Sequence, residues 1–465
     1  MALPSDSGPD ARFYMQNSTE EPDREANVVV AAGVQPQHNE GSHLFAERTP
    51  TAQTITSEQA FMHMVKAMLG TGLLSLPLAF KHSGLYLGMI LLVLICFVCL
   101  YCMRQIVYAA HFVCARNGRE AIDYGNIMRG AVEAGPAWIR HHGYFFKQLV
   151  NCNVFVAQLG FCCVYFVFMA DNLEDFFRKN LNIVLPKAIW MLIISIPVLG
   201  FCSIRKLSKL APFATAANII YLGAVSIVVY FFFNNLKSTD ELTKWGELRD
   251  LPLFFGTVMF AFEGVSVIMI IENRMQSPQN FIQWNGVLNT SCMMVLAIFS
   301  VIGFYGYLAV GDDVADTVTL NLPDEPFFQI LKIMFVLCVL VSYPIQFFVP
   351  LERVEKFISR KCPPEKHTQY MYSARFGIVM ITLVVAEMVP HLALFIALMG
   401  AVACSALALL FPPMIDLLVA SAKNELTSVC YLKNFVLLGF ALLGFTTGTY
   451  SALSDIVKTF EPQEI

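Results

Sequence analysis

Two apolar stretches of the sequence carry the residues best suited to binding a small charged molecule. The first, Phe61–Phe80, holds Gly70-Thr71-Gly72 near its middle. Glycine lacks a Cβ atom and tolerates non-helical backbone, so a helix over this stretch would unwind most easily there. Unwinding exposes backbone N–H groups at the start of the second half-helix, whose dipole favours an anion. A carboxylate fits that place, and the carbonyl end of the first half-helix suits an ammonium group or a cation.

The second stretch, Pro252–Ile271, has an acidic residue in its interior. Glu263-Gly264 follows Phe260 and Phe262 there. A carboxylate at membrane depth is expensive to insert, so it usually faces a polar cavity or a partner. Two alternatives stay open. For the first stretch, the alternative is that Gly-Thr-Gly is only a close contact between helices. For the second, the alternative is that Glu263 accepts hydrogen bonds from unwound amides and never changes protonation.

Two further polar residues precede the Gly-Thr-Gly. His63 and Lys66 are three residues apart and share one face of the first half-helix. A histidine titrates in the physiological range, so His63 is a candidate for proton coupling together with Glu263. The alternative is that His63 is an ordinary interfacial residue. Lys66 is interpreted as extending its charged end to the membrane interface.

The composition explains why these stretches are helices in a membrane. The chain has 465 residues, of which 56% are hydrophobic and 14% are charged, against about 25% charged in an ordinary soluble domain. The mean hydropathy is +0.59. These values exclude soluble globular, disordered, collagen-like and disulfide-scaffold classes. The net charge of −4 offers no basic field for nucleic acid.

The sequence gives no sign of metal or enzyme chemistry. The 13 cysteines are mostly embedded in apolar runs, where they act as small hydrophobic residues. The common zinc-protease, phosphate-loop and nucleophile-elbow motifs are missing. We therefore expect a protein that is not an enzyme and that has no metal and no cofactor.

Eleven apolar stretches approach the roughly 20 residues that a bilayer needs. They cover approximately 57–80, 84–110, 145–170, 187–203, 210–233, 252–271, 285–310, 327–350, 371–388, 391–419 and 434–457. Residues 1–55 have the composition of a disordered tail, and residues 56–460 form the predicted transmembrane domain. Pro390 makes a helix end plausible between the ninth and tenth stretches.

Loop charges predict the orientation of the chain. If the tail is cytoplasmic, the loops on its side carry 18 Lys and Arg residues and the opposite side carries 8. Cytoplasmic loops are enriched in these residues, so the N-terminus is predicted to be cytoplasmic. An odd number of spans then places the C-terminus outside the cell or in a lumen. No positively charged segment followed by an apolar segment begins the chain, so a cleaved signal peptide is not expected.

Several blocks of the sequence resemble those of proton-coupled amino acid transporters in the amino acid/auxin permease superfamily. In chain order these blocks are Met68–Phe80, Gln158–Asn172, Pro252–Thr257, Phe262–Gly264, Thr319–Pro323, Ser405–Leu409, Pro412–Pro413 and Gly448–Tyr450. The resemblance implies an all-α polytopic membrane protein with an inverted-repeat fold of five plus five spans and an extra helix. It also implies symport of small neutral amino acids with H⁺, in a plasma or lysosomal/endosomal membrane.

The resemblance assigns roles to individual positions as well. The first-span histidine of the family matches His63. The substrate-site backbone maps to Leu69–Leu73 and Phe260–Gly264. The full set of predicted substrate-binding residues is Met68, Leu69, Gly70, Thr71, Gly72, Leu73, Phe260, Ala261, Phe262 and Gly264. Two departures are that Ala67-Met68 stands where relatives often have Gly-Asn, and that loops 171–187 and 311–326 contain no cysteine for the bridge that some relatives carry.

The interrupted first and sixth spans would occupy corresponding positions if the halves are about 57–233 and 252–419, with 434–457 as the extra helix. Such matching interruptions indicate the central site of a secondary transporter. We expect cotransport of glycine, alanine or proline with H⁺, with side-chain size limited by Phe260 and Phe262. One alternative is an amino-acid receptor with little flux, signalling to cytoplasmic partners through the tail or loop 351–375. Another is a passive channel.

Overall fold

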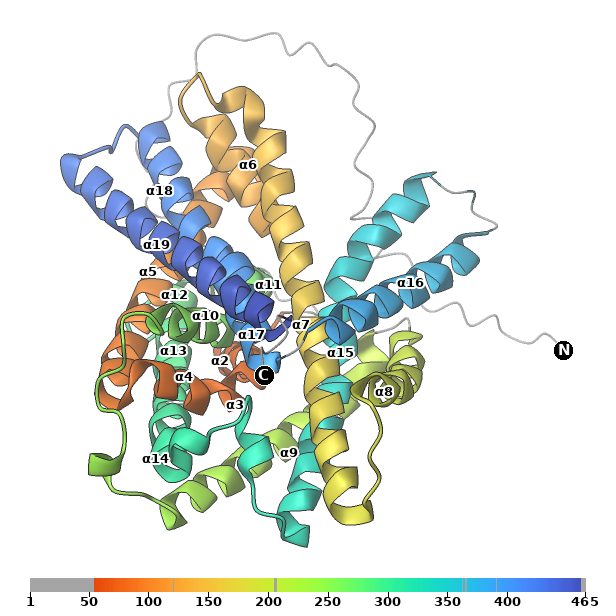
Figure 1. Cartoon of the computed structure of the whole chain (residues 1–465). Coiled ribbons are helices and arrows are strands. Elements are labelled where there is room, and N and C mark those ends of the chain that lie inside the picture. The colour runs from red at the N-terminus through yellow and green to blue at the C-terminus, as the bar shows by residue number, and fades with distance from the viewer. Residues whose placement is uncertain are drawn as a thin grey trace, which may run out of the picture. The chain divides into compact units, whose positions relative to one another are not determined.

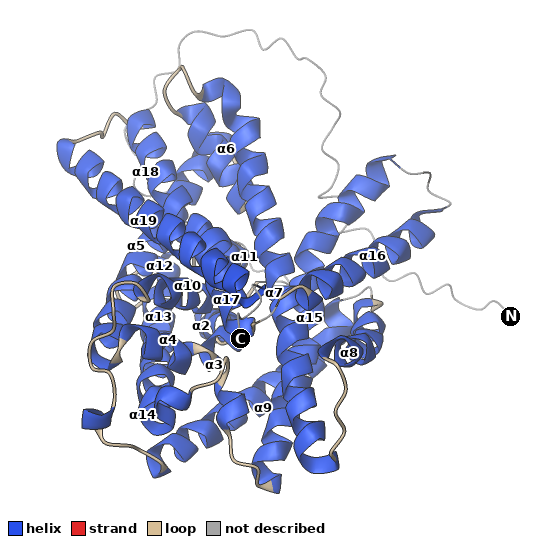
Figure 2. Ribbon diagram, viewed as in Figure 1, coloured by secondary structure: helices blue, strands red, loops and turns tan. Residues whose placement is uncertain are grey.

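The computed structural model describes residues 54–119, 121–204, 207–361, 363, 366–389 and 391–460. Over these residues the chain is helical, and its only β pairing is an isolated bridge between Ile55 and Met275 (Figure 2). The predicted disordered tail lies almost wholly outside the described residues, and so does Pro390. The helices on either side of it, α16 (His367–Glu387) and α17 (Leu392–Met399), are separate as predicted.

The helices reproduce the eleven predicted spans. Nine segments of the described chain are long and apolar enough to cross a membrane, α8 (Lys187–Cys202) is a shorter apolar helix, and the first span is broken into pieces (Figure 1). The long helices outside the breaks are α5 (Leu85–Asn117), α7 (Gly143–Leu181), α9 (Leu207–Asn234), α13 (Val287–Ser300) with η3 (Val301–Tyr305) and α14 (Gly306–Val310), α15 (Pro326–Lys361), α18 (Phe411–Ala422) and α19 (Ser428–Phe460).

The first and sixth spans are interrupted where the glycines predicted. The first consists of α2 (Ser57–Met68), α3 (Thr71–Leu74) and α4 (Leu76–Ser83), with Gly70 in extended backbone before α3. The sixth consists of α10 (Leu251–Ala261) and α11 (Val265–Glu272). A capping box between Thr56 and Gln59 begins α2. Both interruptions are confirmed.

Span ten approaches span six so closely that side chains are excluded from the contact. Span ten runs from α17 through two π-helical turns, η7 (Gly400–Cys404) and η8 (Ala406–Leu410), into α18. A Cβ atom on Gly400 would lie 2.8 Å from the backbone nitrogen of Phe260. Glycine at 400 therefore lets the two backbones touch beside the break in span six.

A helix of eleven residues between the second and third spans was not predicted. The segment between the second and third predicted spans contains α6 (Tyr124–Ala134). Asp123 caps this helix, because its Oδ1 accepts a hydrogen bond from the Asn126 amide at 2.7 Å. The hydroxyl of Tyr124 donates to the carbonyl of Leu407 in span ten at 2.7 Å. An eleven-residue amphipathic helix is too short to be found by a search for membrane-length apolar runs.

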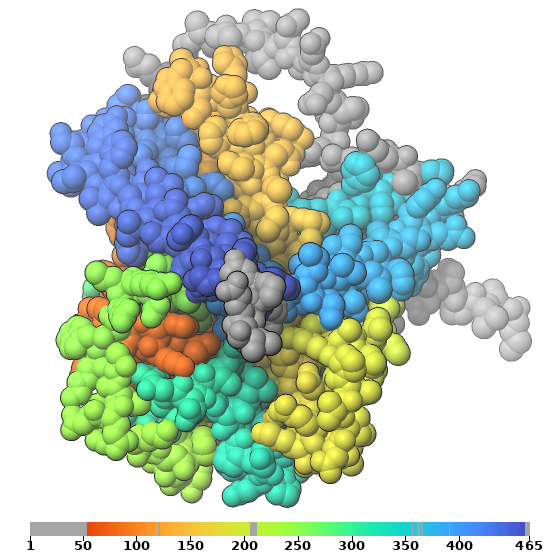
Figure 3. Space-filling model, viewed as in Figure 1, coloured from red at the N-terminus to blue at the C-terminus, as the bar shows by residue number. Residues whose placement is uncertain are grey.

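The surface of α19 has the character of a lipid-facing helix. This helix lies on the face shown in Figure 3, and its exposed apolar side chains include Leu432, Phe435, Leu443 and Tyr450. Its buried positions are mostly small or polar, such as Gly444 and Gly448. This inverted pattern is expected where the surrounding solvent is hydrocarbon rather than water.

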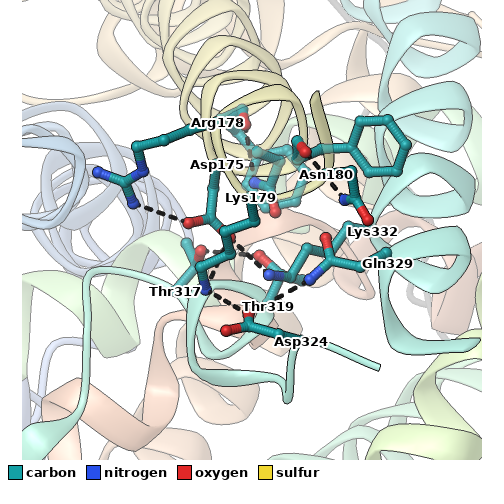
Figure 4. Close-up of polar contacts among 12 residues, drawn as sticks. Asp175, Arg178, Lys179, Asn180, Thr317, Thr319, Asp324, Gln329 and Lys332 are labelled. Atoms are coloured by element: carbon teal, nitrogen blue, oxygen red, sulfur yellow. Dashed lines mark hydrogen bonds and ion pairs between the residues drawn. The ribbon is translucent and has the colours of Figure 1, made fainter. Parts of the chain in front are cut away.

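A buried ion-pair network joins spans three and eight at the ends that the predicted topology places outside (Figure 4). Lys332 of α15 is fully buried, and its Nζ lies 2.6 Å from Asp175 Oδ2 of α7. Asp175 also pairs with Arg178 at 2.9 Å and with Lys179 at 3.3 Å, and Lys179 pairs with Asp324 at 2.7 Å. Asp175 therefore has several cationic partners, whereas Lys332 has one acidic partner among the described residues.

This asymmetry predicts unequal effects of removing either charge. Asp175→Asn leaves a buried ammonium unpaired, and breaking such a pair costs about 3–5 kcal/mol. Lys332→Met should destabilise less, because Asp175 keeps Arg178 and Lys179. The melting temperature of the purified protein should therefore fall more for Asp175→Asn, and Asp175→Leu combined with Lys332→Met should recover much of the loss. Equal losses in the two single variants would contradict this account.

Candidate functional site

The two interruptions face a cavity of about 330 Å³. Spans one, three, five, six and eight all contribute to its wall. The lining residues are Ile55, His63, Lys66–Gly72, Gln158, Phe161, Tyr165, Ala217, Asn218, Tyr221, Phe260, Ala261, Glu263, Ser266, Val267, Ile270, Ile271, Arg274, Cys338, Val339, Ser342, Ile345 and Gln346. The cavity is thus centred on the segments where the helical backbone is broken.

Most of the predicted site residues line this cavity, and three do not. Those that line it are His63, Met68, Leu69, Gly70, Thr71, Gly72, Phe260, Ala261 and Glu263. Leu73 is fully buried in the apolar core. Phe262 packs its ring against Phe299, with centroids 4.8 Å apart. Gly264 faces Met68, whose Cε would lie 2.6 Å from a Cβ atom at 264.

The backbone at the first interruption leaves donors available. The Leu69 amide donates to Val65 at 3.0 Å, and the Leu73 amide donates to Gly70 at 3.2 Å. Thr71 and Gly72 begin α3, where a helix provides no acceptor for its first amides. None of the described side chains caps this end of α3. These amides can therefore bind an anion in the cavity.

Span five holds the first interruption from the side. The hydroxyl of Tyr221 in α9 donates to the carbonyl of Gly70 at 2.8 Å. Tyr221 is one of two tyrosines in this apolar stretch, and nothing in the sequence distinguished it for this role. Gln158, Tyr165, Asn218, Ser342 and Gln346 were likewise not predicted, although each lines the cavity.

Tyr221→Phe is expected to weaken the site without unfolding the protein. The variant keeps the ring, which packs on Phe335 with centroids 5.6 Å apart, and removes only the bond to Gly70. Loss of one hydrogen bond is worth about 0.5–1.5 kcal/mol, so ligand affinity should fall by roughly two- to tenfold. Binding of labelled amino acid to the purified protein checks this. Unchanged affinity would show that Tyr221 does not hold the break.

The two interruptions touch each other at Gly72. A Cβ atom there would lie 2.9 Å from the Cα of Ala261 and 2.9 Å from Cδ1 of Phe260. Phe260 in turn meets Phe161 of span three, with ring centroids 4.9 Å apart. Spans one, three and six therefore form one continuous wall, and an aromatic pair closes part of it.

Glu263 lies in this wall with one carboxylate oxygen unsatisfied. Its side chain is buried, and Oε1 accepts a hydrogen bond from the Ser266 amide at 3.3 Å. Oε2 has no hydrogen-bond partner in the part of the chain that the structure describes. The same holds for Oε1 of Gln158, which is 2% exposed. Both residues line the cavity.

The cavity is reached from one side. His63 and Lys66, towards the beginning of span one, are exposed, and Arg274 lies just beyond the end of span six. At the other end, a void of only about 10 Å³ beside Ser75 lies between α4 and spans six and ten. There the Lys81 ammonium donates to the Asp312 carbonyl at 2.7 Å, and the Gly246 amide donates to Ser83 at 2.8 Å.

No group of three or more His, Cys, Asp or Glu residues within the described ranges could hold a metal ion. The cysteines of those ranges are free.

A cavity between two broken helices is the arrangement typical of secondary transporters. Comparison with known proteins shows that the chain belongs to the transmembrane amino acid transporter protein family, whose model matches residues 53–454. The members and relatives are transporters, which agrees with the expectation of a protein that is not an enzyme.

Two curated relatives and one solved structure illustrate the similarity. The proton-coupled amino acid transporter-like protein pathetic of Drosophila melanogaster is 31% identical over 414 residues, which cover 88% of this chain and 87% of the relative. The probable amino acid transporter skat-1 of Caenorhabditis elegans is 24% identical over 461 residues, covering 95% and 99%. Mhp1, a nucleobase-cation-symport-1 family transporter, aligns with a TM-score of 0.50 at 13% identity, covering 89% of this chain and 95% of Mhp1. The predicted fold class is confirmed.

Proposed function

We propose that this protein is a secondary active transporter that carries small neutral amino acids, of the glycine, alanine and proline type, together with a proton. The observation that carries the proposal is the cavity at the two interruptions, where backbone amides and carbonyls are released from helical hydrogen bonding. Its relatives are named as amino acid transporters, one of them proton-coupled.

The substrate carboxylate is proposed to bind the amides of Gly70, Thr71 and Gly72. The ammonium group faces carbonyls near Met68 and Ala261, at the ends of the first half-helices. Phe260 limits the size of the substrate side chain, supported by Phe161. Phe262, packed on Phe299, does not share this role. Leu73 and Gly264 are proposed to support the backbone of the two interruptions and not to contact the substrate.

Glu263 and His63 are the proposed proton-coupling residues. Glu263 lies at the depth of the substrate, and His63 lies towards the mouth of the cavity. With the N-terminus in the cytoplasm, this mouth opens to the cytoplasm, so the structure represents an inward-facing state. The protein is a multi-pass membrane protein, and we place it in the plasma membrane or in lysosomal or endosomal membranes, with the C-terminus outside or in the lumen.

Counterflow tests this proposal. The purified chain in liposomes, preloaded with unlabelled alanine, should take up labelled alanine faster than unloaded liposomes, because a carrier returns fastest when it is occupied. Glycine and proline inside should replace alanine, and phenylalanine should not. Saturable binding without counterflow would overturn transport and favour the receptor. Uptake that does not saturate would favour a channel.

A further inference from the structure

Two cationic side chains line the cavity towards its mouth. Lys66 lies on α2, four residues before Gly70, and Arg274 follows the end of α11. Both residues are exposed, and neither forms an ion pair with any residue that the structure describes. Glu263 is the only acid among the described lining residues, and it lies at the break in span six. The mouth therefore has two positive charges that no described residue pairs.

Backbone hydrogen bonds join the ends of spans one and six that carry these charges. The Ile55 amide donates to the Arg274 carbonyl at 2.8 Å, and the Gln276 amide donates to the Ile55 carbonyl at 3.3 Å. Ile55 also lines the cavity, and His63 of the same lining is within electrostatic range of both Lys66 and Arg274. The two cations therefore lie at one entrance.

Two like charges at an entrance act on a solute without touching it. Clefts lined by one sign of charge focus the electric field and change the local concentration of charged solutes by roughly tenfold or more. The field extends about 10 Å at an ionic strength of about 0.1 M. A zwitterion has no net charge and is little affected, whereas a cation is repelled and an anion is attracted.

We infer that Lys66 and Arg274 form a charge filter at the mouth of the cavity, which admits neutral and anionic solutes and excludes cationic ones. This inference rests on the proposed function and refines it, because the site then selects amino acids by net charge as well as by side-chain size. A lysine-type amino acid is excluded at the mouth, before its size is tested at Phe260.

A cysteine placed inside the cavity measures this field without any substrate. A Cβ atom at Gly70 meets nothing within 4 Å, so Gly70→Cys provides a thiol in the lining. The purified full-length variant is treated with an anionic or a cationic methanethiosulfonate, which carry a sulfonatoethyl or a trimethylammonioethyl group. Modification at position 70 is followed by peptide mass spectrometry, and each rate is divided by the rate with free cysteine.

The anionic reagent is expected to react faster at position 70. Its normalised rate should exceed that of the cationic reagent by roughly tenfold at low salt, and the two rates should converge at high salt. A role of the two cations in folding alone would produce neither this preference nor its dependence on salt.

Removal of both charges should abolish the preference for the anionic reagent. Lys66→Gln combined with Arg274→Gln should bring the two normalised rates together, and each single substitution should do so in part. Arg116→Gln is the matched control, because Arg116 is exposed at the end of α5 and is not among the residues that line the cavity. It should keep the full preference.

Serine and 2,3-diaminopropionate test the filter on amino acids. They differ by the exchange of a hydroxyl group for an amine, which adds a positive charge at mildly acidic pH. Both compete with labelled alanine for the purified protein. In Lys66→Gln combined with Arg274→Gln, 2,3-diaminopropionate should gain roughly tenfold in affinity relative to serine, and Arg116→Gln should show no gain.

The outcomes separate this inference from the proposal beneath it. Equal normalised rates at position 70, or a preference that survives removal of both charges, would overturn the charge filter while amino acid binding stands. If the parent binds neither alanine nor serine, the proposed function fails, and the thiol rates still decide whether the field exists. Should Gly70→Cys not fold, the native thiol of Cys338, which also lines the cavity, provides the same two rates.

Discussion

Gly72→Ala is expected to abolish transport and to lower the melting temperature of the purified protein. The added methyl group would lie 2.9 Å from the Cα atom of Ala261, which is backbone and cannot move aside without shifting span six. Overpacking of this kind costs about 1–3 kcal/mol. Because the displaced segments form the wall of the cavity, binding of labelled alanine should fall by about tenfold or more.

Two glycines provide controls for this substitution. A Cβ atom at Gly70 meets nothing within 4 Å, so Gly70→Ala should keep the melting temperature, although its methyl group enters the site. Gly439, on α19, also has open space around it, so Gly439→Ala should keep both stability and transport. A Gly72→Ala variant as stable and active as Gly439→Ala would show that spans one and six do not need this contact.

Glu263→Gln is expected to uncouple transport from the proton gradient. Glutamine has nearly the same shape and can keep the hydrogen bond from Ser266, but it cannot gain or lose a proton. Counterflow of alanine should persist, while dependence of net uptake on external pH should be lost. The measurement is the initial rate of uptake into liposomes between pH 5 and pH 8, compared with parent.

Glu387→Gln is the matched control for the loss of a carboxylate. Glu387 is exposed at the end of α16 and is not among the residues that line the cavity. Its replacement by glutamine should therefore leave the pH profile of uptake unchanged. If Glu263→Gln also keeps the pH profile of the parent, Glu263 is a structural acceptor. The proton-coupling role then passes to His63, and His63→Gln becomes the variant that should lose pH dependence.

The features that were predicted best from the sequence are those that depend on the local backbone or on the length of an apolar run. Apolar runs of membrane length located the spans, and Gly70-Thr71-Gly72 and Glu263-Gly264 located the interruptions, because glycine and a buried carboxylate disturb a helix where they stand. The boundaries of the two halves, 57–233 and 252–419, stay a prediction, since no repeat between them is visible at the level of residues.

Features that depend on contacts between distant helices were not predicted. Phe260 and Phe262 were treated alike, but Phe260 lies in the last turn of α10 and Phe262 follows the end of that helix. Of the two, Phe260 lines the cavity, whereas Phe262 packs on Phe299. Tyr221 and Gln158 are polar residues in long apolar runs that contain other polar residues as well. Polar residues within membrane spans tend to face a cavity, so Gln158 could have been selected on that ground.

The ion-pair network at Asp175 and Lys332 is a second feature that could not be predicted, because it joins residues far apart in the sequence. Its members are 157 residues apart in the sequence, and Lys332 follows closely after a predicted outer loop, where a lysine is ordinarily exposed. That it is fully buried depends on how α15 packs against α7. Such a network can be recognised only after the fold places its residues together.

The central claim is tested most directly by steady-state accumulation of labelled alanine and proline in liposomes that contain the purified chain, with a pH gradient of one unit and no membrane potential. Coupling to one proton predicts accumulation towards about tenfold above the equilibrium level on the alkaline side, collapsing when a protonophore is added. Uptake that reaches the same level with and without the gradient would contradict proton symport.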